Sequence, residues 1–278
     1  MRTAIWPEGT RGTVFVFPGR TEYVEKYSDA ATHLHDLGFA SVAVDWRGQG
    51  LTERPAHDRK VGHVNDFNDF QRDIDVILEH AREIDLPRPW HMLAHSMGGL
   101  IGLRAAGRGL FDRVAFSAPM WGLPIVPHMR AAGWTLSAAA SALGFGERGA
   151  TGWGKVADPA AAPFEGNLLT TDPDMFDWMK RQVSAHPDLA LGGPSLGWLW
   201  AALREMHHLA RQSAPNIPCL VILGTEEGIV DVDAIHVRLA SWPDARLELV
   251  EGGRHETLME APATRARLFA LVADHFGA

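Results

Sequence analysis

Ser96 stands between an apolar run typical of a buried strand and a run of small residues typical of a helix, in HMLAHSMGGL (91–100). A nucleophilic serine needs a strained strand-to-helix turn that projects its hydroxyl, with small side chains two residues before and after it. Ala94 and Gly98 meet that requirement. The helix would begin near Met97 and point free N–H groups at the reacting centre. An N-cap serine is the alternative, because serine is common before helices.

The partners that such a nucleophile requires follow it in the chain. A base must take the serine proton, and a third group must orient that base. In this topology the acid precedes the histidine, and both lie on loops after later strands. VEGGRHETLME places His255 directly after the last apolar run, and ILGTEEGIVD places Glu226, Glu227 and Asp231 after the preceding run. Chain order alone does not choose among these three carboxylates.

Ester cleavage also needs two backbone N–H groups that stabilise the oxyanion. Met97 follows the serine directly and would supply one of them. The segment FPGRTE follows the run TVFVF, where Gly19 permits a turn and Arg20 would offer the second N–H. A plain turn glycine is the alternative for Gly19. We expect neither a cofactor nor a metal, since the histidine pair at 207–208 lacks companions at ligand spacing.

The elements that must position these residues follow a regular alternation. Six short apolar runs are continuous rather than alternating, as strands covered on both faces should be. They are residues 13–19, 40–46, 90–96, 113–119, 219–225 and 247–253. Segments with helical spacing, such as 23–37 and 67–81, lie between them. The pattern predicts an α/β fold with a mostly parallel central sheet flanked by helices.

The alternation stops between about residues 121 and 205. We therefore expect residues 1–120 and 206–278 to form one core domain and residues 121–205 to form an inserted helical cap. Six tryptophans mark this insertion: Trp121, Trp134, Trp153, Trp178, Trp198 and Trp200. They either form the small core of a helical subdomain or, in addition, line an apolar pocket over the site.

Composition excludes several classes of protein. The chain has 278 residues and a net charge of -8 with no block of lysine and arginine, which argues against nucleic-acid binding. Its single cysteine, Cys219, lies in an apolar run and is expected to be buried and unpaired. The start lacks the apolar stretch of a signal peptide and no run is long enough to span a membrane, so we expect a cytoplasmic protein. Peripheral contact with the inner membrane and the oligomeric state stay open.

Seven motifs, in order over almost the whole chain, carry a resemblance to a known family. They are FPGRTEYVEKY, DWRGQGLTER, VGHVNDFNDF, LAHSMGG, SAPMWGL, EEGIVD and GGRHE. This set resembles the lysophospholipase and monoacylglycerol lipase branch of the α/β-hydrolases, and most closely the bacterial lysophospholipases. The resemblance implies a sheet of up to eight strands, a cap inserted after the sixth, and a metal-independent Ser-acid-His triad acting on esters with one fatty acyl chain.

Carried over residue by residue, the resemblance makes Ser96 the nucleophile, His255 the base, and the N–H groups of Arg20 and Met97 the oxyanion donors. It implies a serine esterase that cleaves lysophospholipids or monoacylglycerols through an acyl-enzyme. A short-chain carboxylesterase, amidase or peptidase of the same fold remains an alternative, as does a binding protein without turnover. Exposed cap tryptophans would add weak contact with a membrane surface.

The chain departs from the family pattern at several positions. Glu227 matches the catalytic acid in the pattern Gly-x-x-acid-x-x-Val, where aspartate is usual, so Asp231 remains the alternative acid. Pro18 stands where many monoacylglycerol lipases have histidine. The first recognisable strand begins near residue 13, so one outer strand of the family sheet is in doubt. Asp45, which ends a strand in DWRGQG, is expected to be structural.

Overall fold

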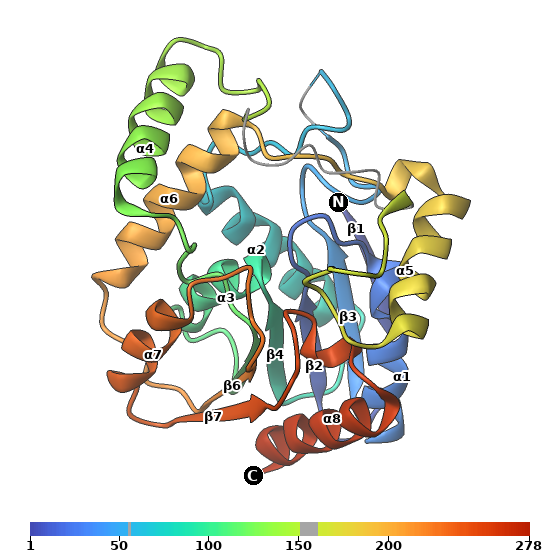
Figure 1. Cartoon of the computed structure of the whole chain (residues 1–278). Helices are drawn as coiled ribbons and strands as arrows, with labels where there is room; N and C mark the ends of the chain where they lie inside the picture. Colours follow the sequence, from blue (N-terminus) through green and yellow to red (C-terminus); the bar gives the residue numbers. More distant parts are fainter. Residues whose placement is uncertain (55–56, 151–160) are drawn as a thin grey trace.

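Seven strands form one central sheet in the computed structural model, which describes residues 1–54, 57–150 and 161–278. They are β1 (Arg2–Trp6), β2 (Thr13–Phe17), β3 (Ala40–Asp45), β4 (Trp90–His95), β5 (Arg113–Ser117), β6 (Cys219–Gly224) and β7 (Ala245–Val250). Their order is β1-β3-β2-β4-β5-β6-β7 (Figure 1). β1 pairs antiparallel with β3, and the other strand pairs are parallel. The predicted mostly parallel sheet is confirmed.

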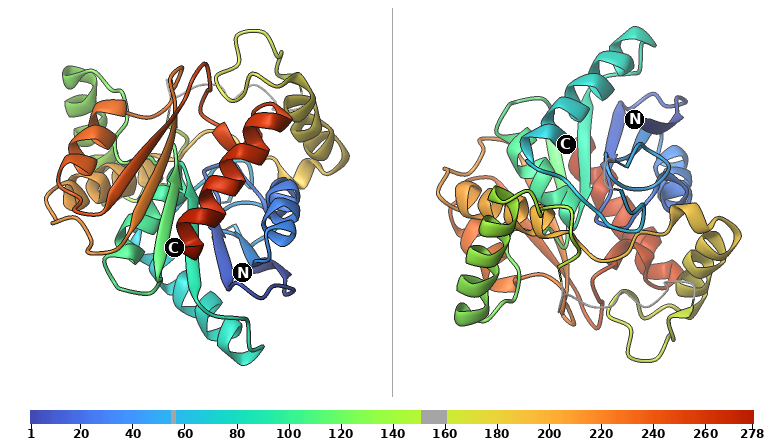
Figure 2. Two further views of the ribbon diagram at one scale, coloured as in Figure 1. Left: turned by 90° about the horizontal axis from the view of Figure 1, so that it is seen from below. Right: turned by 90° about the horizontal axis from the view of Figure 1, so that it is seen from above.

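Helices cover both faces of this sheet, as the two views in Figure 2 show. The α-helices are α1 (Ser28–Asp36), α2 (Asn68–Glu83), α3 (Met97–Ala106), α4 (Pro127–Ala142), α5 (Pro173–Ala185), α6 (Leu196–Ala210), α7 (Val232–Ala240) and α8 (Pro262–Gly277). Short 3-10 helices are η1 (Val24–Tyr27), η3 (Pro187–Leu189) and η4 (Thr257–Met259). Alternate strand residues face opposite layers: Met92 packs with α2 and α3, and Leu93 packs with α1 and α8. This double cover explains the continuous apolar runs.

The two edge strands depart from the sequence pattern. β1 was not predicted, and all five of its residues are half-buried. The run at 247–253 was expected to be covered on both faces, but β7 lies at the opposite edge and most of its residues are partly or fully exposed. An edge strand lacks a neighbouring strand on one side and is therefore more exposed. An apolar run in the sequence does not distinguish such an edge strand from an inner strand.

The segment between β5 and β6 carries α4, α5 and α6. In Figure 1, α4 and α6 lie side by side, and α5 lies on the other side of the molecule. The rings of Trp134 and Trp200 join α4 to α6 at a centroid distance of 4.9 Å. Trp121 instead packs in the main core, and Trp153 lies outside the described residues. The expected boundary at residues 205 and 206 falls within α6.

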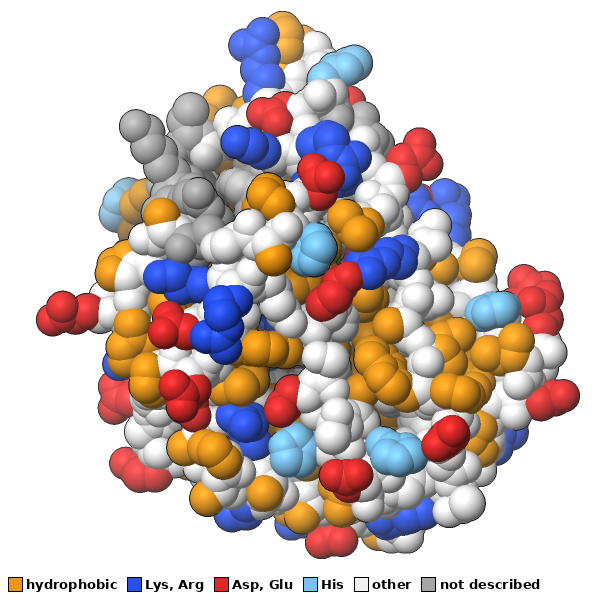
Figure 3. Space-filling model, turned by 90° about the vertical axis from the view of Figure 1, so that its right-hand side faces the viewer, with side chains coloured by type: hydrophobic (Ala, Val, Ile, Leu, Met, Phe, Trp, Pro, Cys, Tyr) orange, Lys and Arg blue, Asp and Glu red, His pale blue; other side chains and the backbone are white. Residues whose placement is uncertain are grey.

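The surface carries charges of both signs, and the single cysteine lies in the interior. On the face seen in Figure 3, side chains of both charges are interspersed with apolar ones. Cys219 is buried on β6 and is not part of a disulfide. Among the described residues, no helix combines the length and apolar character needed to cross a membrane.

Candidate active site

Ser96 occupies a strained turn between β4 and α3. Its backbone angles are φ 50° and ψ −118°, in a region that residues with a side chain rarely adopt. The turn also brings α3 against β2, because a Cβ atom built on Gly98 would lie 2.1 Å from the carbonyl oxygen of Phe17. The glycine two residues after the serine is therefore required by packing, as the motif predicted.

The N-cap explanation of this serine is wrong. The Ser96 side chain accepts no hydrogen bond from the first turn of α3. Ser195, before α6, shows what a capping serine does, since its Oγ accepts the N–H of Trp198 at 2.9 Å. The hydroxyl of Ser96 instead lies 2.9 Å from Nε2 of His255.

His255 joins the serine to a carboxylate from a different loop. Its Nδ1 lies 2.8 Å from Oε2 of Glu227. An ionised carboxylate only accepts hydrogen bonds, so Nδ1 carries the proton and Nε2 is free to accept the hydroxyl of Ser96. The structure thus brings three predicted site residues together in one continuous chain of hydrogen bonds, although 159 positions separate the serine from the histidine.

The carboxylate of Glu227 is held in its ionised form by its surroundings. Its side chain is fully buried, and burial alone would raise the pKa of the carboxyl. The hydrogen bond and charge of His255 outweigh burial and, with the N–H groups of Ile229 and Val230, hold the pKa below its ordinary value. A buried negative charge beside the imidazole would stabilise an imidazolium.

The other two carboxylates of this loop have different surroundings. Asp231 is the N-cap of α7, where its Oδ1 accepts the N–H of Ala234 at 3.2 Å. Its Oδ2 lies 3.8 Å from the guanidinium of Arg130. Glu226 is exposed. Within the described structure, only Glu227 of these three is hydrogen-bonded to His255.

The loop after β2 lies directly against the nucleophile. A Cβ atom built on Gly19 would lie 3.0 Å from Cβ of Ser96, so a larger residue here would crowd the nucleophile. Across the described residues, the backbone N–H groups of Arg20 and Met97 have no protein acceptor. Both amides are thus available to a ligand, as donors to an oxyanion would have to be.

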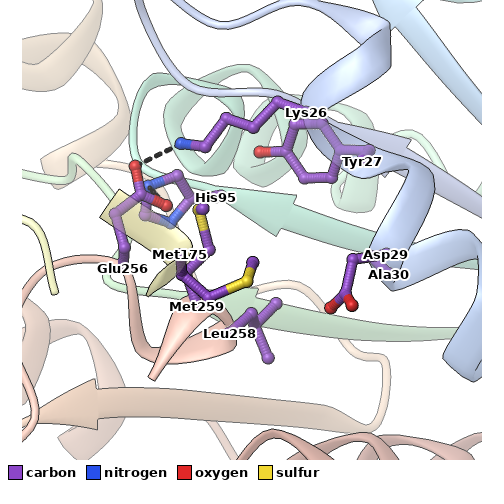
Figure 4. A pocket seen from close by; sticks show the side chains of 9 residues that line it. All are labelled: Lys26, Tyr27, Asp29, Ala30, His95, Met175, Glu256, Leu258 and Met259. Carbon is purple, nitrogen blue, oxygen red and sulfur yellow. Dashed lines mark hydrogen bonds and ion pairs between the residues drawn. The ribbon is translucent and has the colours of Figure 1, made fainter. Parts of the chain in front are cut away.

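Asp45 and His95 illustrate what the sequence did and did not reveal. Asp45 accepts the N–H groups of Val24 and Leu51, each at 2.8 Å, so it has a structural role as expected. Strand alternation from Ser96 predicts that His95 is a packing residue whose side chain points away from the site. The residue is buried, but its side chain points toward the base. Its ring lies 4.7 Å from the ring of His255. Its Nε2 lies 3.3 Å from a carboxylate oxygen of Glu256, and Figure 4 shows these two side chains side by side.

Comparison with known proteins assigns the family. A family model described as "Serine aminopeptidase, S33" matches residues 8–262. This chain belongs to the S33 family. Lysophospholipase L2 of Escherichia coli (strain K12) is 33% identical over 277 residues, which cover 95% of this chain and 79% of that protein. Probable lysophospholipase L2 of Haemophilus influenzae is 29% identical, with 99% of this chain and 87% of that protein covered.

The family match, together with these two lysophospholipase relatives, confirms the resemblance to the lysophospholipase and monoacylglycerol lipase branch. A monoglyceride lipase from Saccharomyces cerevisiae, solved with a substrate analog, superposes with a TM-score of 0.75 at 21% identity. That alignment covers 99% of this chain and 90% of the yeast chain. The predicted α/β-hydrolase fold is therefore confirmed.

Proposed function

We propose that this S33 protein is a serine hydrolase that cleaves carboxylic esters of single-acyl lipids. His255 Nε2 takes the proton of the Ser96 hydroxyl, whose Oγ attacks the ester carbonyl carbon. The N–H groups of Arg20 and Met97 stabilise the oxyanion. His255 then protonates the departing alcohol and activates the water that releases the fatty acid. The continuous hydrogen-bond chain from Ser96 through His255 to Glu227 carries this proposal.

We also propose that residues 121–205 act as a cap in a cytoplasmic enzyme. They lie between β5 and β6 of one sheet, and α4 and α6 lie on one side of the molecule (Figure 1). The ring centre of Trp198 of α6 lies 5.2 Å from the guanidinium of Arg20 in the loop against the nucleophile. An acyl chain bound beneath α4 and α6 would contribute about 0.8 kcal/mol for each buried methylene. Long chains should therefore be preferred over short ones, in keeping with the names of the lysophospholipase relatives.

The side chain of Arg20 favours a lysophospholipid over a monoacylglycerol. Its guanidinium lies 5.2 Å from the ring centre of Trp198 on α6, and Nη2 donates to Gly192 O at 2.8 Å. Burial lowers the pKa of Arg20 to about 10. No carboxylate of the described residues pairs with this guanidinium, and its Nε lacks an acceptor. A phosphodiester is the chemical group that such an arginine fits, and the two substrate classes differ in that group.

Replacing Arg20 by methionine tests both the substrate class and this assignment. The variant keeps the backbone N–H proposed for the oxyanion and loses only the guanidinium. We expect the wild type to hydrolyse long-chain lysophospholipids and monoacylglycerols faster than p-nitrophenyl acetate. The variant should lose about 10- to 100-fold in kcat/KM on the lysophospholipid and little on a monoacylglycerol with the same acyl chain. The ratio of the two kcat/KM values is the measurement.

Arg148→Met is the matched control, because Arg148 also lies over an aromatic ring, 4.5 Å from the ring centre of Phe145. It should leave the ratio unchanged. An equal loss on both substrates in Arg20→Met would contradict head-group recognition but not the esterase. A wild type fastest on acetate or on an amino-acid anilide would instead favour a short-chain esterase or a peptidase. Absence of turnover on every activated ester would favour a binding protein.

One stripe of α4 supports a weak contact with lipid aggregates. Met129 and Leu136 on α4 and Leu143, its C-cap residue, recur every seven residues and are 58%, 59% and 70% exposed. We propose that this stripe, rather than the cap tryptophans, contacts the aggregate surface. Leu136→Asp should abolish the rise in lysophospholipid hydrolysis above the critical micelle concentration, without affecting a monomeric ester. Val237→Asp, which changes a 74% exposed residue of α7, is the control and should keep that rise.

A further inference from the structure

Four ionisable side chains are buried together behind the proposed catalytic residues. Glu22, Lys26, His95 and Glu256 are only 4%, 7%, 3% and 7% exposed. The ammonium of Lys26 donates hydrogen bonds to carboxylate oxygens of both Glu22 and Glu256. His95 completes the cluster through its contact with Glu256. Figure 4 shows Lys26, His95 and Glu256 converging beside a small cavity that Met175 also lines.

Members of this charge cluster contact or lie next to the loops that carry the proposed catalytic groups. Glu22 accepts the N–H of Gly19, so it fixes the loop that carries one oxyanion donor. His95 directly precedes the nucleophile, and Glu256 directly follows the base. Lys26 bridges Glu22 to Glu256, which lies 230 positions after the lysine in the sequence. The cluster therefore ties the oxyanion loop, the nucleophile turn and the histidine loop to one another.

The charges of the cluster stabilise one another. Burial alone would lower the pKa of Lys26, but Glu22 and Glu256 outweigh it and raise the pKa above its ordinary value. Burial likewise opposes the charged form of His95, and the same carboxylates raise its pKa. Burial would raise the pKa of Glu256, yet His95 and Lys26 hold it well below its usual range. Two acidic groups thus face two basic ones.

Stability alone is a poor explanation for this arrangement. Removing four charges from water is costly, and apolar side chains of similar volume would stabilise a core at least as well. A metal ion is also a poor explanation. Glu22, His95 and Glu256 offer ligand atoms within 4.8 Å of one another, but the ammonium of Lys26 already occupies the cation position between the two carboxylates.

We propose that Lys26 is a positioning residue for ester hydrolysis, acting through Glu22 on the oxyanion loop and through Glu256 on the loop of His255. This inference rests on the proposed function, because its readout is turnover. Lys26 touches neither the nucleophile nor the base in the described structure, so its loss should leave substrate binding intact. It should slow the chemical step, where a misplacement of about 1 Å can cost about 100-fold in rate.

The test compares Lys26→Met with the charge-balanced pair Lys26→Met, Glu256→Gln. Active sites are counted by titration with a fluorophosphonate, and kcat and KM are measured per titrated site on one p-nitrophenyl ester. We expect kcat to fall about 10- to 100-fold with KM within about a factor of two in both variants. The melting temperature should fall in the single variant and recover in the pair, which keeps the test valid if the single variant folds poorly.

Arg104→Met, with and without Glu205→Gln, is the matched control. This partly buried bidentate pair, with both contacts at 2.6 Å, joins α3 to α6 but touches none of the three loops. Its loss should lower the melting temperature and leave kcat per site unchanged. A wild-type kcat in the charge-balanced Lys26 pair would overturn the proposal, and so would an equal fall of kcat in the Arg104 variants. A wild type without turnover above a Ser96→Ala blank would instead reject the proposed function.

Discussion

Replacing Ser96 by alanine is expected to abolish labelling by a fluorophosphonate and to lower kcat by about 10⁶-fold. The Oγ atom is the only group of this residue that the mechanism uses, and it lies 2.9 Å from Nε2 of His255. The substitution also removes no helix-capping hydrogen bond, because the Ser96 side chain accepts none from α3. The fold should therefore be retained. Covalent labelling is detected as an increase in protein mass by mass spectrometry. Ester hydrolysis is measured on the same preparation.

Ser195→Ala supplies the control for this experiment. Ser195 also precedes a helix and is buried, but its hydroxyl accepts the N–H of Trp198. The same hydroxyl lies 2.7 Å from Nδ1 of the buried His63, so its removal should cost about 1 to 3 kcal/mol of unfolding free energy and should leave labelling intact. Persistent labelling of Ser96→Ala at an unchanged rate would place the nucleophile elsewhere.

The inner strands could be predicted from the sequence because a parallel sheet buries both of its faces. The runs that begin at residues 13, 40, 90, 113 and 219 begin where β2 to β6 begin. β1 could not be predicted in this way. Its sequence, RTAIW, is half-buried and joins the sheet through antiparallel pairing with β3. That pairing leaves no periodic pattern of apolar residues in β1 itself.

Functional residues could be predicted where the backbone leaves a local mark. Gly98 marks the turn of Ser96, and Gly252 and Gly253 mark the turn before His255. The choice of acid required the family resemblance, because three carboxylates follow β6 within a few residues. The charge cluster around Lys26 could not be predicted, since its members come from three separate segments and meet only in the tertiary structure.

Glu227→Gln is expected to lower kcat by about 10⁴-fold with little change in the fold. An amide at this position can present its NH₂ group to Nδ1 of His255, which favours the wrong tautomer of the imidazole. Asp231→Asn should leave kcat nearly unchanged, and it should change the unfolding free energy by less than about 0.5 kcal/mol, because asparagine caps a helix as well as aspartate does. Steady-state kinetics on one ester compares the two variants directly.

The pH dependence of stability gives an independent check on Glu227. Its folded pKa lies below the ordinary value, so its ionised form stabilises the fold above a pH of about 4.3, the unperturbed value. That stabilisation is lost as the pH falls through the lower, folded pKa. The glutamine variant lacks it, so the difference in unfolding free energy between wild type and variant should shrink on acidification. A large loss of kcat in Asp231→Asn, with Glu227→Gln fully active, would require Asp231 to leave the N-cap of α7 during catalysis and replace Glu227 beside the imidazole.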